Sequence, residues 1–348
     1  MISGHGTARR AASPTMRGLK SAGSASAFTP NTRMQMRKDT PMTEIESNAR
    51  PRSRIGPWVR ILIILTIIIG AGWLTGCMER MFYIPTREST PASMGPPGTE
   101  SVWFTSEDGT RLHGWFMPAR NRQDSDQPAP TILHVHGNAG SVRSHAWFTE
   151  HLPPAGFNVF LFDFRGYGES EGRPTRRRPL IADTRAALDA ILERDDVDPD
   201  RIGMYAQSLG AAIGVNVMAE RDELRAAVLE SPFASWREIA ADAIGGGPIA
   251  RTLAAVLIPD HSRPDEAMKR IDRPILIVHG KDDRIVPIHH GQAMSRAGGE
   301  NVELHEFDAG NHNVLRQTHP EVDDLTIDFL RKHLGDNGSR AEPSDDGG

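Results

Sequence analysis

Short apolar runs alternate with amphipathic stretches along most of the chain, from about residue 82 to residue 334. Strands buried on both faces are expected at residues 131–136, 158–163, 202–206, 226–230, 275–279 and 302–307. Apolar residues recur at helical spacing near residues 143–153, 180–194, 209–221, 289–297 and 320–334. This alternation predicts an α/β fold, with a mostly parallel sheet and helices on both faces.

An antiparallel hairpin is expected ahead of this series. Two alternating runs, residues 101–105 and 111–117, are separated by the turn residues Glu107, Asp108 and Gly109. The chain therefore has one predicted α/β domain, over residues 82–334. Residues 1–57 are rich in Ser, Thr, Gly, Pro and Arg without apolar periodicity, and residues 335–348 are polar, so both ends are predicted to be disordered.

The most apolar run, residues 61–74, follows several arginines and predicts a membrane signal within residues 58–78. Its 14 residues would reach only ~21 Å as a helix, short of the ~30 Å hydrocarbon core. That length favours a secretory signal peptide. The alternative is an uncleaved transmembrane signal anchor, extended at both ends. Either interpretation places everything after residue 77 on the extracytoplasmic side of a membrane.

The single cysteine, Cys77, comes directly after this run. Leu74-Thr-Gly-Cys77 resembles the bacterial lipoprotein signal, in which the cysteine is lipidated and becomes the mature N-terminus. We favour lipidation of Cys77 over the uncleaved anchor. A lone cysteine also excludes an internal disulfide and every multi-cysteine metal site.

Composition and charge limit the function classes. The 348 residues are 38% hydrophobic and 24% charged, which is typical of a globular protein. The net charge of -5 leaves no excess of positive charge to neutralise a phosphate backbone, so general nucleic-acid binding is excluded.

Candidate chemistry lies at the ends of the predicted strands. Tyr205-Ala-Gln-Ser-Leu-Gly210 passes from a strand into a helix, which is the context of a nucleophile elbow at Ser208, although a helix N-cap would also explain that serine. Asp282 and Asp283 follow a later strand, and His312 follows the last one. Serine, acid and histidine thus occur in the chain order of a hydrolase triad.

These stretches resemble the alpha/beta-hydrolase superfamily, and within it the membrane-anchored serine hydrolase branch that includes protein depalmitoylases. The matching segments are residues 136–140, 163–170, 206–210, 230–235, 279–287 and 310–313. Ala206 and Asn311 stand where a glycine is commoner in the family, and neither position carries a reacting group.

The resemblance implies a role for each site residue. Ser208 is the expected nucleophile, His312 the general base and then acid, and Asp283 the carboxylate that orients His312. Asp283 is preferred to Asp282 because the family places this acid three residues before a Val-Pro pair. The backbone N–H groups of Leu209 and Asn138 are the expected oxyanion hole.

A small cap over the site is expected from the insertion at about residues 234–273. We expect most of its apolar residues to pack within the cap rather than to line an acyl pocket. They are Trp236, Ile239, Ile244, Ile249, Leu253, Val256, Leu257 and Ile258.

The resulting prediction is a serine hydrolase that cleaves carboxylic esters or thioesters through an acyl-enzyme. A serine peptidase of the same fold is the alternative, and a non-catalytic binding module is less favoured because a complete triad would then have no use. The expected partners are a small or acylated substrate and a membrane. No metal and no organic cofactor is implied.

Overall fold

The computed structural model describes residues 56–120 and 127–335. The predicted disordered head and tail fall on residues 1–57 and 335–348, almost all of which lie outside the described part of the chain. The predicted α/β domain, residues 82–334, lies within it apart from residues 121–126.

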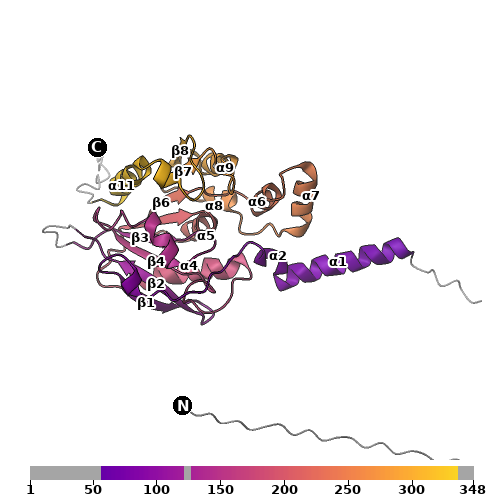
Figure 1. The fold of residues 1–348 in the computed structure, drawn as a ribbon, viewed down its shortest axis with the longest axis horizontal. Coiled ribbons are helices and arrows are strands. Elements are labelled where there is room, and N and C mark those ends of the chain that lie inside the picture. Colours follow the sequence, from indigo (N-terminus) through magenta and orange to yellow (C-terminus); the bar gives the residue numbers. More distant parts are fainter. Residues whose placement is uncertain (1–55, 121–126, 336–348) are drawn as a thin grey trace, which may run out of the picture. The chain divides into compact units, whose positions relative to one another are not determined.

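One eight-stranded sheet organises the domain, in the order β1-β2-β4-β3-β5-β6-β7-β8 (Figure 1). The hairpin strands β1 and β2 pair antiparallel, β2 pairs antiparallel with β4, and all later neighbours are parallel. The strands are β1 (Glu100–Thr105), β2 (Arg111–Met117), β3 (Thr131–Val135), β4 (Asn158–Phe162), β5 (Ile202–Gln207), β6 (Leu224–Glu230), β7 (Ile275–Gly280) and β8 (Val302–Phe307). The predicted mostly parallel sheet and the hairpin are confirmed.

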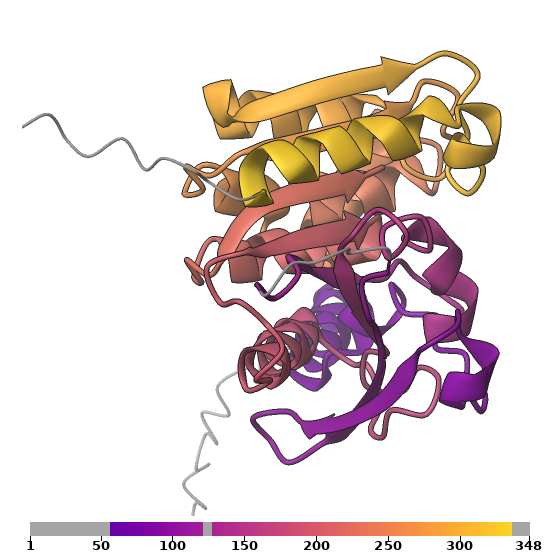
Figure 2. The same ribbon diagram turned by 90° about the vertical axis from the view of Figure 1, so that its left-hand side faces the viewer.

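Helices cover both faces of this sheet, as predicted. One apolar cluster joins the sheet to α4 (Arg177–Leu192), α5 (Leu209–Met218), α8 (Pro264–Met268) and α9 (His289–Gly298). A second cluster joins the opposite face to α3 (Val142–His145), α10 (Leu315–Thr318) and α11 (Glu321–Leu334). Figure 2 shows α11 lying along the strands. Short 3-10 turns occur at η1 (Ala92–Met94), η2 (Ala146–Phe148) and η3 (Gly299–Asn301).

The helix predicted over residues 143–153 is wrong in length. α3 ends at His145, η2 ends at Phe148, and the chain then continues in turns. Pro153 and Pro154 lack the backbone N–H that a helix needs, and Gly156 adopts a positive φ of 97°. The apolar residues Phe148 and Leu152 are nevertheless buried. The pattern therefore identified the buried positions correctly but not the backbone conformation.

The cap lies between β6 and β7. Of the range predicted for it, about residues 234–273, the first part holds α6 (Trp236–Asp242) and α7 (Pro248–Leu257), which lie beside each other in Figure 1, whereas α8 packs in the core against the sheet. Gly245, Gly246 and Gly247 separate these helices, and the first two of them have positive φ.

Two helices precede the domain, α1 (Pro57–Thr75) and α2 (Cys77–Arg80). Gly76 ends α1 in a left-handed conformation, with φ 73°. Among the described residues, no helix is both long enough and apolar enough to cross a membrane. Within α2, Glu79 is buried and its carboxylate accepts a hydrogen bond from Nε of Arg177 at 2.9 Å. This ion pair ties the segment after Cys77 to the start of α4.

Candidate active site

Ser208 occupies a tight turn between β5 and α5. Its backbone has φ 53° and ψ -113°, a conformation that costs of order 1–3 kcal/mol in a non-glycine residue and recurs at functional sites. Gly210 is required by this geometry, because a Cβ there would lie 1.9 Å from the carbonyl oxygen of Val135. Ala206 is fully buried at the end of β5, so its extra methyl group is accommodated.

The loop after β7 carries the two candidate acids, and they differ in environment. Oδ2 of Asp283 lies 2.7 Å from Nδ1 of His312. Its Oδ1 accepts hydrogen bonds from the backbone N–H groups of Ile285 and Val286, at 2.9 and 2.8 Å. The Asp282 side chain is exposed. The fold therefore brings Asp283, and not Asp282, to the histidine.

The Asp283 carboxyl is held in its charged form. Burial by itself raises the pKa of this carboxyl, but the nearby His279 imidazole and the hydrogen bonds from His312 and the backbone N–H of Val286 outweigh it and bring the pKa below its ordinary value. A carboxylate at Nδ1 keeps a proton on that nitrogen of His312, which leaves Nε2 free to accept another.

Ser208 and His312 line one cavity of about 340 Å³, together with Asn138 and Leu209. The rest of its wall is mainly apolar, and the residues concerned are Phe82, Ile84, Ala139, Phe148, Phe233, Trp236, Ile239, Ile285 and Val286. Its remaining polar members are His145, Gln207 and Asn313. All the residues predicted for the triad and the oxyanion hole thus meet at this cavity, with Asp283 behind His312.

Known proteins resemble this chain over most of its length. Residues 126–263 match the family described as "Serine aminopeptidase, S33". The chain is 33% identical over 280 residues to the protein YfhR of Escherichia coli K12, across 79% of this chain and 95% of that protein. It is 29% identical over 288 residues to the "Alpha/beta hydrolase domain-containing protein WAV2" of Arabidopsis thaliana, across 77% and 92% of the two chains. The chain belongs to the alpha/beta-hydrolase superfamily.

Solved structures show the same fold. An esterase of Pyrococcus furiosus, Pf2001, matches with a TM-score of 0.60 at 23% identity, across 73% of this chain and 99% of the esterase. A puromycin-hydrolyzing peptidase of Mycobacterium tuberculosis matches with a TM-score of 0.54 at 18% identity, across 68% and 39%. The alpha/beta-hydrolase fold of this chain is therefore shared with both an esterase and a peptidase.

A contact that sequence reasoning missed joins this hydrolase site to the N-terminal segment. The Asn138 side chain donates to the carbonyl oxygen of Phe82 at 2.7 Å and accepts from the N–H of Ile84 at 2.9 Å. The Tyr167 hydroxyl donates to the same amide oxygen at 2.8 Å. Asn138 therefore fixes both the predicted oxyanion loop and the segment that forms one wall of the cavity. No local pattern signals this contact, because more than 50 residues separate its partners.

A second missed feature is a buried acid behind the nucleophile. Glu230 is fully buried at the end of β6, and its backbone oxygen accepts from the N–H of Ser208 at 2.9 Å. Its side chain accepts from the Tyr205 hydroxyl. Burial raises the pKa of Glu230 to about 7, although the Tyr205 hydrogen bond and the Arg316 charge oppose that rise.

The cap differs from the prediction that most of its apolar residues pack. Trp236 is fully buried, lines the cavity and meets the ring of Phe82 edge-on, with ring centroids 5.3 Å apart. Ile258 is also buried. Half of the set is exposed instead, namely Ile244, Ile249, Leu253 and Val256. Three of these, Ile249, Leu253 and Val256, lie along one face of α7, and that face is open to solvent.

Proposed function

We propose that this protein is a serine hydrolase that cleaves carboxylic esters or thioesters with Ser208, His312 and Asp283. One observation carries the proposal. A strained serine and a histidine line one apolar cavity, and that histidine is hydrogen-bonded at 2.7 Å to a buried carboxylate.

Each group then has a defined step. Nε2 of His312 removes the proton from the Ser208 hydroxyl as its oxygen attacks the substrate carbonyl carbon. The imidazolium next gives that proton to the leaving alcohol or thiol, and an acyl-serine remains. Water, deprotonated by His312, then attacks the acyl carbon, and the imidazolium gives this proton to the leaving Ser208 oxygen, which releases the acid and restores the serine. Asp283 keeps the imidazole oriented and stabilises its charged form throughout.

The negative charge of the tetrahedral intermediate would be stabilised by the backbone N–H groups of Leu209 and Asn138. Leu209 opens α5, where helix geometry leaves the first N–H groups without helical acceptors and the helix dipole favours negative charge. Asn138 lies on the same cavity wall, in a loop that its own side chain ties in place.

The cavity favours an acyl group over a peptide. Its wall is mainly apolar, and none of the described residues that line it is Asp or Glu. An aminopeptidase needs a negative group for the charged amino terminus of its substrate. A peptidase remains the second candidate, because the matched family is described as a serine aminopeptidase.

The first test uses a fluorophosphonate probe with panels of esters, thioesters and peptides. We expect labelling of Ser208 and turnover of esters or thioesters, with an optimum in an acyl-chain-length series. Ser208→Ala should abolish labelling and lower kcat on the order of 10⁴-fold or more, while circular dichroism stays unchanged. Retained burst kinetics in this variant would contradict the assignment, and a preference for peptides would favour the peptidase.

We also propose that the protein is attached to a membrane through its N-terminal region, with the hydrolase domain on the extracytoplasmic side. The helices α1 and α7 support this proposal because both carry exposed apolar side chains. They are also linked to each other, since the Trp73 indole N–H of α1 donates to the Leu257 carbonyl oxygen at the end of α7 at 2.9 Å. The exposed residues include Ile61, Leu62, Ile64, Ile67 and Ile68 of α1 and Ile249, Leu253 and Val256 of α7.

Lipidation of Cys77 would provide that attachment. Cys77 is exposed. Residues after it still contact the domain, because Glu79 accepts a hydrogen bond from Arg177 and the Phe82 carbonyl accepts one from Asn138. If the cysteine is processed, Cys77→Ser should leave a longer precursor, and labelled palmitate should enter only the wild-type chain in a bacterial host. Detection of intact Arg60–Arg80 sequence in the mature protein would instead establish the uncleaved anchor.

A further inference from the structure

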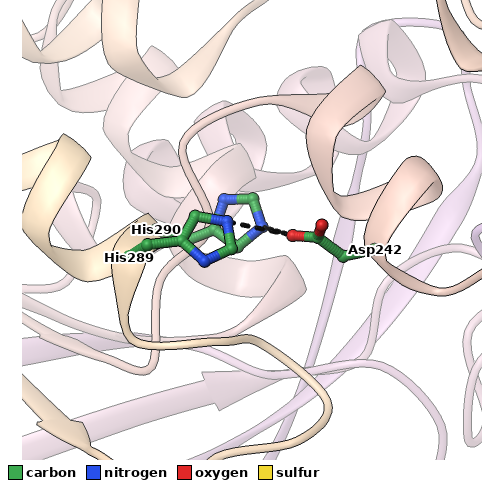
Figure 3. A group of neighbouring side chains, drawn as sticks. All are labelled: Asp242, His289 and His290. Atoms are coloured by element: carbon green, nitrogen blue, oxygen red, sulfur yellow. Dashed lines mark hydrogen bonds and ion pairs between the residues drawn. The ribbon is translucent and has the colours of Figure 1, made fainter. Parts of the chain in front are cut away.

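Three potential metal ligands meet outside the catalytic cavity, where the cap contacts the domain. Asp242 is the last residue of α6, and His289 and His290 are the first two residues of α9. Figure 3 shows both imidazole rings directed toward one carboxylate. Nε2 of His289 lies 3.0 Å from Oδ2 of Asp242, and Nε2 of His290 lies 3.1 Å from the same oxygen.

These separations suit a small divalent cation. Zinc binds imidazole nitrogen and carboxylate oxygen at ~2.0–2.2 Å with tetrahedral angles, so two ligand atoms on one ion lie ~3.3 Å apart. The three ligand atoms of this group all lie within 4.8 Å of one another. The two separations from the carboxylate oxygen to the imidazole nitrogens are within a few tenths of an ångström of that zinc spacing.

The group of three ligands is buried on one side and open to solvent on the other. His290 is fully buried, and Asp242 is largely buried at the end of a helix. His289 is half exposed, and its ring packs on that of His290 with centroids 4.4 Å apart. Water can therefore reach the group and complete the coordination of an ion. Two His and one carboxylate with an open position is a common zinc ligand set.

One hydrogen bond opposes metal binding and limits its strength. The Ala234 N–H points at Nδ1 of His290 over 3.4 Å, which is longer than an ordinary N–H···O or N–H···N contact. To bind a cation through Nε2, His290 must carry its proton on Nδ1 and give up this long contact. We therefore expect micromolar affinity rather than the tight binding of a structural zinc site.

We propose that Asp242, His289 and His290 form a binding site for a divalent transition metal, with zinc as the preferred ion, that ties the cap helix α6 to α9. α6 also carries Trp236 and Ile239 into the wall of the catalytic cavity, so the ion would hold that wall in place. The proposal goes beyond the proposed hydrolase chemistry and does not depend on it.

The test is metal binding by the full-length protein, stripped with a chelator and titrated with Co²⁺ and then Zn²⁺. Absorption bands of low-symmetry Co²⁺, displaced by Zn²⁺, should report one ion per chain. Asp242→Asn and His289→Ala should each weaken binding by at least ~10-fold. His305→Ala is the matched control, because His305 is partly exposed and also pairs with a carboxylate, Glu303 at 2.7 Å, but on β8. It should bind like the wild type.

A thermal unfolding series keeps the test independent of misfolding. Zn²⁺ should raise the Tm of the wild type and of His305→Ala, and should not raise that of His289→Ala, whose exposed position makes loss of the fold unexpected. The proposal is wrong if no stoichiometric binding occurs, or if His289→Ala binds as well as the wild type. Equal weakening by His289→Ala and His305→Ala would identify adventitious surface binding and would also overturn it.

Discussion

At the scale of single residues, two adjacent aspartates provide a sharp comparison. Asp283 contacts His312 at 2.7 Å, whereas the Asp282 side chain is exposed. Asp283→Asn should lower kcat on the order of 10⁴-fold, because an amide no longer holds the imidazole in the productive tautomer. Asp282→Asn should change kcat by less than about twofold, since an exposed charge is screened by solvent. Steady-state kinetics on one ester measures both, and equal losses would leave the acid unassigned.

Glu230 predicts a pH dependence of stability. The folded chain raises the pKa of Glu230 from 4.5 to about 7. Between these values the folded protein keeps a proton that the unfolded chain releases, so this group destabilises the fold progressively as pH rises from about 4.5 to about 7. The loss amounts to at most about 3 kcal/mol.

Glu230→Gln should remove this dependence while its amide oxygen still accepts from the Tyr205 hydroxyl. Urea unfolding at pH 5, 6, 7 and 8 should therefore show a flatter profile for the variant, with its largest relative gain at pH 8. If both proteins lose stability equally over this range, another group causes the dependence.

At the scale of elements, the buried Glu79–Arg177 pair joins α2, at the start of the segment that reaches the cavity, to α4. Arg177 is fully buried and lies over the Trp236 ring at 4.3 Å. Glu79→Ala leaves that guanidinium buried without its carboxylate, and we expect a loss of about 3–5 kcal/mol in the free energy of unfolding. Ester kcat/KM should fall as well, because Phe82 and Ile84 of the same segment line the cavity.

A matched control for this change is Glu171→Ala. Glu171 pairs with Arg111 at 3.8 Å, and both side chains are more than half exposed. Loss of such a surface pair should cost no more than about 1 kcal/mol. Chemical denaturation measures both variants, and similar losses would mean that the Glu79 pair does not hold the segment.

At the scale of the whole molecule, the described contacts predict where the functional unit can begin. A chain that starts at Cys77 keeps Glu79, Phe82 and Ile84 and loses the Trp73 hydrogen bond to Leu257. It should fold and keep the kcat of the full chain. A chain that starts at Arg87 loses the Arg177 partner and one cavity wall, so its Tm and activity should both fall. Failure of the Cys77 chain to fold would show that α1 is part of the domain.

Much of this fold is predictable from local patterns in the sequence. The alternation of apolar runs and helical stretches is enough for the mostly parallel sheet, because strand and helix periods depend on neighbouring residues. The strand-to-helix context of Ser208 is equally local. The helix expected over residues 143–153 fails because burial and backbone form are separate properties, and Pro153 and Pro154 decide the second.

Other features depend on contacts between residues far apart in the chain. Only the tertiary structure closes the cavity with Phe82 and Ile84 and places Asp242 against His289 and His290. The same holds for the cap, where apolar residues that the sequence assigns to packing remain exposed on α7. Sequence patterns record which residues prefer burial and which elements they form. The partner that each side chain meets is set by how those elements pack, and no local signal encodes it.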